Sequence, residues 1–173
     1  MTIDLEYGNP FPKSWGAILT AGSYVQAPFT APGAAPRMVA VPGVETTLSA
    51  ETAGATPIRP LLGPDAAPKI TGTIDAFGAV IVPDPAPTLA WSPPAVGTAA
   101  RYQVMLRELS NMNGRTSVSD VATLTVGSAT SVKVLPGILQ RGHHYVARIQ
   151  ATTAALVPRG RSNVLTGMIS VSP

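Results

Sequence analysis

The second half of the chain alternates apolar and polar residues with a period of two, the pattern of half-buried β-strands. In residues 101–109, for example, Tyr102, Val104 and Leu106 share one side of a strand. Comparable runs cover residues 88–93, 121–126, 132–134, 145–151 and 162–172, and Asn113-Gly114 is a hairpin turn signal. About seven short strands in about ninety residues predict a β-sandwich.

The first half has a less regular pattern, with short apolar runs separated by turn signals. Strands are expected on either side of a turn at residues 21–23, over 37–41 and 44–50 with Pro42-Gly43 between them, and near Ile70 and Ile74. Three prolines in residues 82–88 predict an extended linker. We therefore expect a β-rich N-terminal unit over residues 1–82, either a small β-sandwich-like unit or strands appended to the second, and a β-sandwich over 83–173.

Composition narrows the possible functions. The 173 residues include 45% hydrophobic and only 12% charged residues, with 18 Pro, 16 Gly and no Cys. Disulfides and thiolate metal sites are therefore excluded, and the prolines interrupt nearly every candidate helix. The net charge of +3 is not gathered into a basic block, so nucleic-acid binding has no support.

The sequence also predicts neither a membrane span nor a signal peptide. No run of about 18 uninterrupted apolar residues occurs, so no membrane span is predicted. Residues 1–20 lack the basic start and continuous apolar segment of a signal peptide. A low-charge surface of Thr, Ser, Asn and Gln is common in extracellular β proteins, so we expect an extracellular or cell-surface location.

Three motifs in residues 85–172 together resemble a fibronectin type III domain, an immunoglobulin-like β-sandwich. Trp91 lies in "PTLAWSPP", and the next strand opens Tyr-x-Val-x-Leu at Tyr102. The family's run Leu-x-x-Gly-x-x-Tyr-x-Val-x-Val-x-Ala is matched by Leu139, Gly142, Tyr145, Ala147, Ile149 and Ala151, with Ala147 and Ile149 in place of the valines. The whole chain also resembles uncharacterised exported proteins of myxobacteria, in keeping with its excess of Ala and of Arg over Lys.

The fibronectin type III resemblance implies structural roles for particular residues. Tyr145 corresponds to the tyrosine-corner residue, whose hydroxyl bonds to the backbone just upstream. Leu139 would close the core beneath that turn. Trp91 would be the central core aromatic, with Tyr102 and Ile149 on the inward faces of neighbouring strands.

Candidate chemistry is sparse. His143 and His144 are the only histidines, and neighbours on a strand point to opposite faces, so they are not expected to bind one metal together. No Gly-x-Ser-x-Gly motif, paired-carboxylate motif or phosphate-binding glycine loop occurs. We therefore expect no enzymatic activity, no cofactor and no metal.

The loop "LVPRGRS", residues 156–162, joins the last two predicted strands. In fibronectin type III domains this loop often carries recognition, and here Arg159 and Arg161 could contact an anionic partner. Arg161 stands where an Arg-Gly-Asp tripeptide would have its acid, so that ligand is not implied. The same residues resemble a trypsin- or thrombin-type cleavage site, and proteolytic nicking is expected there.

Three functions remain compatible with these observations. The first is a protein-binding module or scaffold, acting through loops at one end of the sandwich or through strand addition at an exposed edge. The second is a subunit of a surface filament or multimer, in which an N-terminal segment docks on a neighbouring copy. The third is a polysaccharide-binding accessory domain of a hydrolase, with sugars stacking on an N-terminal aromatic group made of Tyr7, Phe11, Trp15 and Tyr24. The same group is more readily explained as the core of the first sheet, because the chain has few other large side chains to fill it.

Overall fold

The described part of the chain consists of β-strands joined by turns and loops. The structure is a computed structural model that describes residues 12, 16, 18–49, 57–64, 66–72, 74–153 and 159–173. Its strands are β1 (Ile18–Phe29), β2 (Arg37–Ser49), β3 (Ala66–Ile70), β4 (Ile74–Asp75), β5 (Val80–Val82), β6 (Thr88–Ser92), β7 (Arg101–Met112), β8 (Arg115–Val126), β9 (Ser131–Lys133), β10 (His144–Thr152), β11 (Gly160–Leu165) and β12 (Ile169–Val171). The described residues contain no helix, as the frequent prolines predict.

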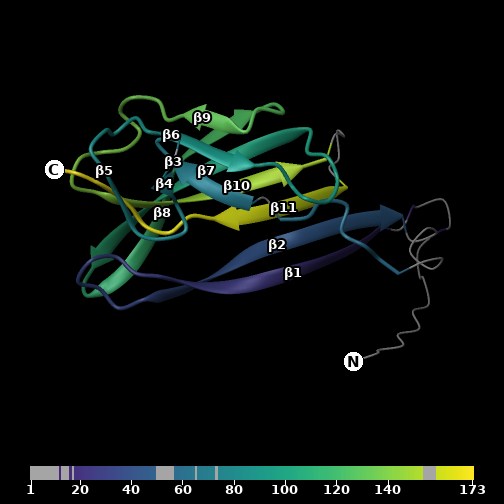
Figure 1. Cartoon of the computed structure of the whole chain (residues 1–173). Helices are drawn as coiled ribbons and strands as arrows, with labels where there is room; N and C mark the ends of the chain where they lie inside the picture. The colour runs from purple at the N-terminus through teal and green to yellow at the C-terminus, as the bar shows by residue number, and fades with distance from the viewer. Residues whose placement is uncertain are drawn as a thin grey trace.

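These strands form two sheets (Figure 1). The smaller sheet is antiparallel in the order β4-β3-β6-β9. In the larger sheet β10 is central, with β7 and then β8 on one side and both β11 and β12 on the other. Beyond β11 the sheet continues through β2 to β1, whereas β12 pairs with β5 in parallel. The prediction of an all-β protein is confirmed.

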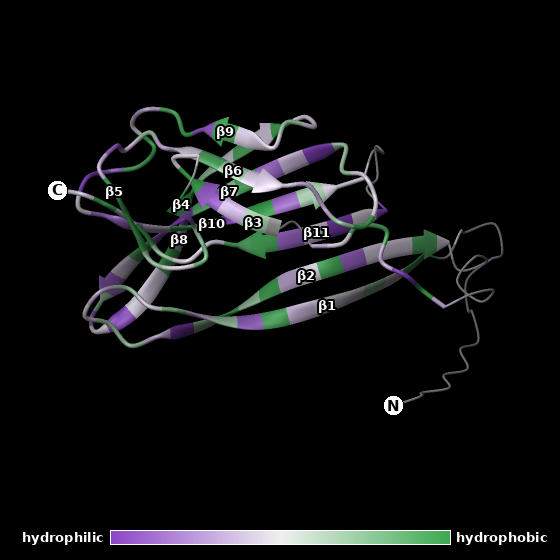
Figure 2. Ribbon diagram, in the orientation of Figure 1, coloured by the Kyte–Doolittle hydropathy of each residue, from purple (hydrophilic) through white to green (hydrophobic). Residues whose placement is uncertain are grey.

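The hydrophobic core lies between the two sheets. It contains Ile70 and Leu89 from the smaller sheet, and Val104, Ala147 and Ile149 from the larger one. Hydrophobic and hydrophilic residues alternate along β7 and β10 (green and purple in Figure 2). The hydrophobic ones face the opposite sheet, because successive side chains of a strand point to opposite faces. The sheets therefore meet through the period-two faces that the sequence pattern indicates.

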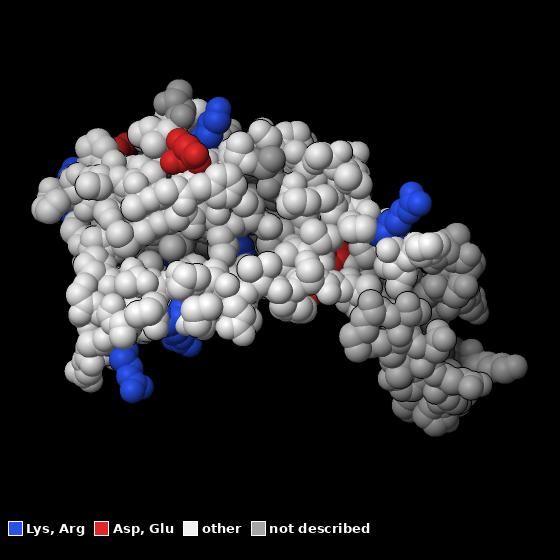
Figure 3. All heavy atoms as spheres, turned by 60° about the horizontal axis from the view of Figure 1, so that its bottom comes forward, with Lys and Arg blue, Asp and Glu red and all other residues white. Residues whose placement is uncertain are grey.

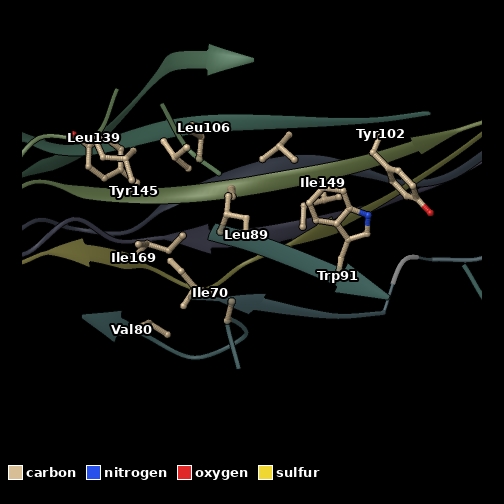
Figure 4. Close-up of a cluster of buried hydrophobic side chains, with 14 of the residues drawn as sticks. Ile70, Val80, Leu89, Trp91, Tyr102, Leu106, Leu139, Tyr145, Ile149 and Ile169 are labelled. Carbon is tan, nitrogen blue, oxygen red and sulfur yellow. The ribbon is translucent and has the colours of Figure 1, made fainter. Parts of the chain in front are cut away.

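The five side chains expected in the core are all buried. Trp91 is 5% exposed, and Tyr102, Leu139, Tyr145 and Ile149 are between 0 and 3% exposed. Trp91 and Tyr102 pack edge to face at one end of the core, with ring centroids 5.2 Å apart, while Tyr145 and Leu139 lie at the other end (Figure 4). The aromatic rings thus fill the two ends of a core otherwise made of small aliphatic side chains.

Tyr145 fixes the turn that precedes β10. The backbone N–H of Gln140 donates to the Tyr145 hydroxyl oxygen at 2.9 Å. Gly142, with φ of +76°, supplies the left-handed backbone that reverses the chain between them. Burial raises the pKa of the Tyr145 hydroxyl, so the group stays protonated under ordinary conditions.

The N-terminal part does not form a sandwich of its own within the described residues, and this corrects one of the two expectations for it. β1 and β2 are a long hairpin that joins the larger sheet through β11, and β3 pairs with β6 in the smaller sheet. Both sheets therefore contain strands from either side of the expected boundary between residues 82 and 83. The buried apolar side chains of residues 66–82 belong to the same core cluster as those of the strands that follow.

β2 runs through Pro42-Gly43, where the sequence predicts a break, and β1 runs through the expected turn at residues 21–23. The reason is a β-bulge. Between the pairs Gly22↔Glu45 and Tyr24↔Pro42, β2 contains one residue more than β1, so Gly43 and Val44 both lie opposite Ser23. The Val44 N–H donates to the Ser23 hydroxyl at 3.1 Å, and the bulge accommodates a proline that would interrupt a regular ladder.

Candidate functional site

The long strand β1 is a free edge of the larger sheet. Within the described residues it pairs with β2 alone, over its whole length from Ile18 to Phe29. A free edge leaves one row of backbone N–H and C=O groups available to another strand. The sequence "ILTAGSYVQAPF" contains no charged side chain that would repel such a strand.

The hydrogen bonds of β2 indicate which groups of β1 are available. The Thr47 N–H donates to the Arg159 carbonyl oxygen, so Thr47 faces the β11 side. Because successive residues of a strand point their backbone groups to opposite sides, the backbone groups of Thr46 face β1, and those of its partner Ala21 face β2. The backbone groups of the even-numbered β1 residues therefore face away from β2, and Pro28, which has no N–H, falls in that outward set, as expected for an edge proline.

Side chains of β1 are exposed on both faces of the strand. Ile18 is 75% exposed, Tyr24 66% and Val25 60%, and of the twelve residues only Phe29 is buried. The Tyr24 hydroxyl donates to a Glu45 carboxylate oxygen at 3.0 Å, and this hydrogen bond to an anion raises the pKa of Tyr24. β1 thus combines a free backbone row with apolar side chains in solvent.

The other edges of the two sheets carry features that discourage strand addition. On β8 the pairing with β7 shifts between Leu106 and Arg107, which places an additional residue in the edge strand itself. The exposed Asp120 of β8 also forms an ion pair with Arg107 at 2.7 Å. β5 and β9 have three residues each, β9 includes Lys133, and β4 has two residues. Bulges, charges and short length are the usual protections of an edge, and β1 lacks all three.

The β1–β2 hairpin is held at both ends. Near its base, residues 44–46 of β2 pair with β11. At its tip, the Ala35 N–H donates to the Gly114 carbonyl oxygen and the Thr116 hydroxyl donates to the Ala35 carbonyl oxygen, both at 2.8 Å. This attachment depends on the Asn113-Gly114 turn, whose φ values of 54° and 78° confirm the predicted hairpin turn. Both anchors fix the position of β1 relative to the sandwich.

Two adjoining hollows lie between this hairpin and the outer face of the larger sheet. One, of about 300 Å³, is lined mainly by apolar side chains including Phe29, Leu109, Val146 and Met168. The other, of about 210 Å³, is lined by Val25, Val41 and Phe77 among others, and the two share Ala27 and Leu165. Figure 3 shows this side of the molecule, on which few side chains are charged. The two hollows next to β1 are lined by apolar and uncharged side chains alone.

The two histidines have separate partners, in keeping with their opposite orientations. His143 Nδ1 is 2.7 Å from a Glu108 carboxylate oxygen, and His144 Nδ1 is 2.9 Å from the Ser170 hydroxyl. They border an open polar hollow of about 250 Å³. Among the described residues no group of three or more His, Asp or Glu could hold a metal ion. Each histidine therefore acts in local hydrogen bonding at the end of the sandwich.

The predicted recognition residues Arg159 and Arg161 lie at the start of β11. Arg161 is half exposed and its guanidinium is 3.7 Å from Glu45 of β2. Arg159 is exposed, and the preceding residues 154–158 lie outside the described part of the chain. Of the aromatic group proposed for sugars, Tyr7, Phe11 and Trp15 also lie outside it, and Tyr24 is bound to Glu45.

Pairing of Arg159 and Gly160 with β2 changes the expectation for proteolysis. The Arg159 carbonyl oxygen accepts the Thr47 N–H at 2.6 Å, and Gly160 is buried opposite Thr46. A protease must bind an extended, unpaired segment around the bond that it cuts. We expect thrombin to cut the Arg159–Gly160 bond at least ~10-fold more slowly in the wild type than in Trp91→Ala, because the lower stability of the variant raises the population of the open chain. Mass spectrometry of the fragments measures this bond alone, and equal rates would contradict the pairing.

Comparison with known proteins gives no relative, since no protein-family model, curated protein or solved structure matches the chain. The described part of the chain also holds no helix of the length and apolarity needed to cross a membrane. Function must therefore be argued from the exposed edge and its surroundings. Sequence reasoning did not single out β1, although the lack of any charge across residues 18–29 was a usable signal.

Proposed function

We propose that the chain is a non-catalytic, extracellular or cell-surface module of fibronectin type III kind that binds a protein partner. Its physical role would be to accept an extended segment of the partner as an additional strand beside β1. Main-chain hydrogen bonds would supply most of the affinity in this mode, and side chains of alternate residues would supply the specificity.

The fibronectin type III assignment is supported by the sheet order and by the tyrosine turn. β3, β6 and β9 lie side by side in one sheet, opposite β8, β7, β10 and β11 in the other. The Gln140 N–H bond to Tyr145 links the residue to backbone just upstream, as in the tyrosine corner of such domains. Only 12% of the residues in the chain are charged, and such a low share of charge fits an extracellular setting.

The observation that carries the binding function is the unprotected edge of β1. A free strand of twelve residues with no charge, no bulge of its own and exposed Ile18, Tyr24 and Val25 is rare in a protein that must avoid unwanted strand pairing. The catalytic alternative has no comparable support among the described residues. The hollow beside His143 contains a His–Glu pair, but no nucleophile is hydrogen-bonded to that histidine.

Strand addition can be tested with a phage-displayed library of random twelve-residue peptides. We expect the wild-type protein to enrich peptides with alternating apolar residues, and Val25→Lys to weaken their binding by ~10-fold or more, because a lysine is a common edge protection. Ile81→Lys is the matched control, since Ile81 is 72% exposed on β5, away from β1. The proposal fails if no peptide is enriched, or if the enriched peptides bind Val25→Lys as well as they bind the wild type.

A further inference from the structure

We infer that the strand which pairs with β1 is the β1 strand of a second copy of this chain. This inference rests on the proposed strand-addition function and names its partner. Two copies related by a two-fold axis perpendicular to the sheet would place their β1 strands side by side and antiparallel, which joins the two larger sheets into one.

Charge is the first argument for a second copy. A partner with many charges would be recognised by opposite charges on the edge, and β1 has none between Ile18 and Phe29. An isologous contact sets each part of β1 against β1 itself, so any charge near the axis would meet a like charge of the other copy. β1 itself brings no charge to the axis, few side chains on this side of the molecule are charged (Figure 3), and the carboxylate of Glu45 beside Gly22 is already paired with Arg161 and Tyr24 of its own chain.

Backbone geometry is the second argument, and it selects one register. The outward-facing residues that carry an N–H are Ile18, Thr20, Gly22, Tyr24 and Gln26, and Gly22 is the middle one. With the axis at Gly22, these residues pair among themselves, Ile18 with Gln26 and Thr20 with Tyr24, through about ten backbone hydrogen bonds. Pro28 then lies beyond the ladder, where its missing N–H costs nothing.

Side chains agree with this register. With Gly22 on the axis, Leu19 of each copy lies opposite Val25 of the other, on the face that includes Phe29. Leu19 is 41% exposed and Val25 60% exposed in the single chain, so two apolar pairs would leave water on association. Glycine on the axis lets the two strands meet without side chains crowding at the centre. The bulge between the pairs of Gly22 and Tyr24 adds its residue to β2, which leaves β1 regular for pairing.

Light scattering coupled to size exclusion tests the inference on the full chain. Over a concentration series that reaches the millimolar range, we expect the wild-type mass to rise from 17.7 kDa to twice that value. Thr20→Pro removes an outward N–H without removing a bond to β2, and Val25→Lys places a charge against Leu19. Each should weaken the dimer by ~10-fold or more, and Ile81→Lys should leave it unchanged.

Hydrogen exchange measured by NMR gives a second readout that a general loss of stability would not reproduce. On raising the concentration, the amides of Thr20, Gly22, Tyr24 and Gln26 should gain protection, while those of Ala21 and Ser23 should not change. A wild-type chain that remains monomeric, or a dimer unaffected by both Thr20→Pro and Val25→Lys, overturns the inference. If the peptides of the library still bind wild type but not Val25→Lys, strand addition stands and only the second copy is rejected.

Discussion

Trp91→Ala should destabilise the protein by about 3–5 kcal/mol, the usual cost of deleting a large buried ring. The side chain is 5% exposed, lies between the two sheets and packs edge to face on Tyr102. The rest of the core consists mainly of Val, Ala, Leu and Ile, which have little capacity to fill the space that the indole leaves. Because the free energy of unfolding of a domain of this size is about 5–15 kcal/mol, the variant should lose a large part of its stability and unfold at a much lower urea concentration than the wild type.

Urea unfolding followed by circular dichroism measures this effect, and two variants calibrate it. Trp91→Phe retains a ring and removes an indole N–H that is buried without a hydrogen-bond partner, so it should cost clearly less than the alanine. Phe77→Ala removes an aromatic ring that is 55% exposed and should change stability by less than about 1 kcal/mol. A Trp91→Ala protein with wild-type stability would show that the indole is not enclosed between the sheets.

The sandwich strands could be predicted because their burial is one-sided. Tyr102, Val104 and Leu106 of β7 and Tyr145, Ala147 and Ile149 of β10 recur every second residue, and the same period puts them on the face that meets the smaller sheet. The Asn113-Gly114 turn was equally readable, since both residues adopt the positive φ that this hairpin type requires. Such signals are local and depend on neighbouring residues alone.

The β1–β2 hairpin could not be read in the same way, because neither face of β1 is fully covered. Its exposed side chains follow no period, and the turn-forming Gly22 and Pro42-Gly43 lie within strands, where the bulge opposite Ser23 accommodates them. The candidate binding edge was hidden for a further reason. Whether a strand lies at the edge depends on which distant strands pair, and the pairing of β2 with β11 joins residues more than a hundred positions apart.

The second large loss of stability is expected where residues 57–64, between this hairpin and the smaller sheet, contact the rest of the molecule. Residues 57–64 pack against the loop between β6 and β7, where the Gly63 N–H donates to the Val96 carbonyl oxygen at 2.9 Å. Gly97 follows in that loop with φ of +76°, and a Cβ on it would overlap the Leu61 carbonyl. We expect Gly97→Ala to cost about 3 kcal/mol or more, because the left-handed strain of about 1–2 kcal/mol is joined by a forced displacement of backbone.

Gly137→Ala separates these two contributions. Gly137 has a similar φ of +87°, but a Cβ there would meet nothing within 4 Å, so only the conformational strain of about 1–2 kcal/mol applies. Thermal unfolding should therefore rank wild type above Gly137→Ala and Gly137→Ala above Gly97→Ala. Hydrogen exchange should also show lost protection at the Gly63 amide in Gly97→Ala alone. Equal stability of the two variants would contradict the close approach of residues 61–63 to the loop between β6 and β7.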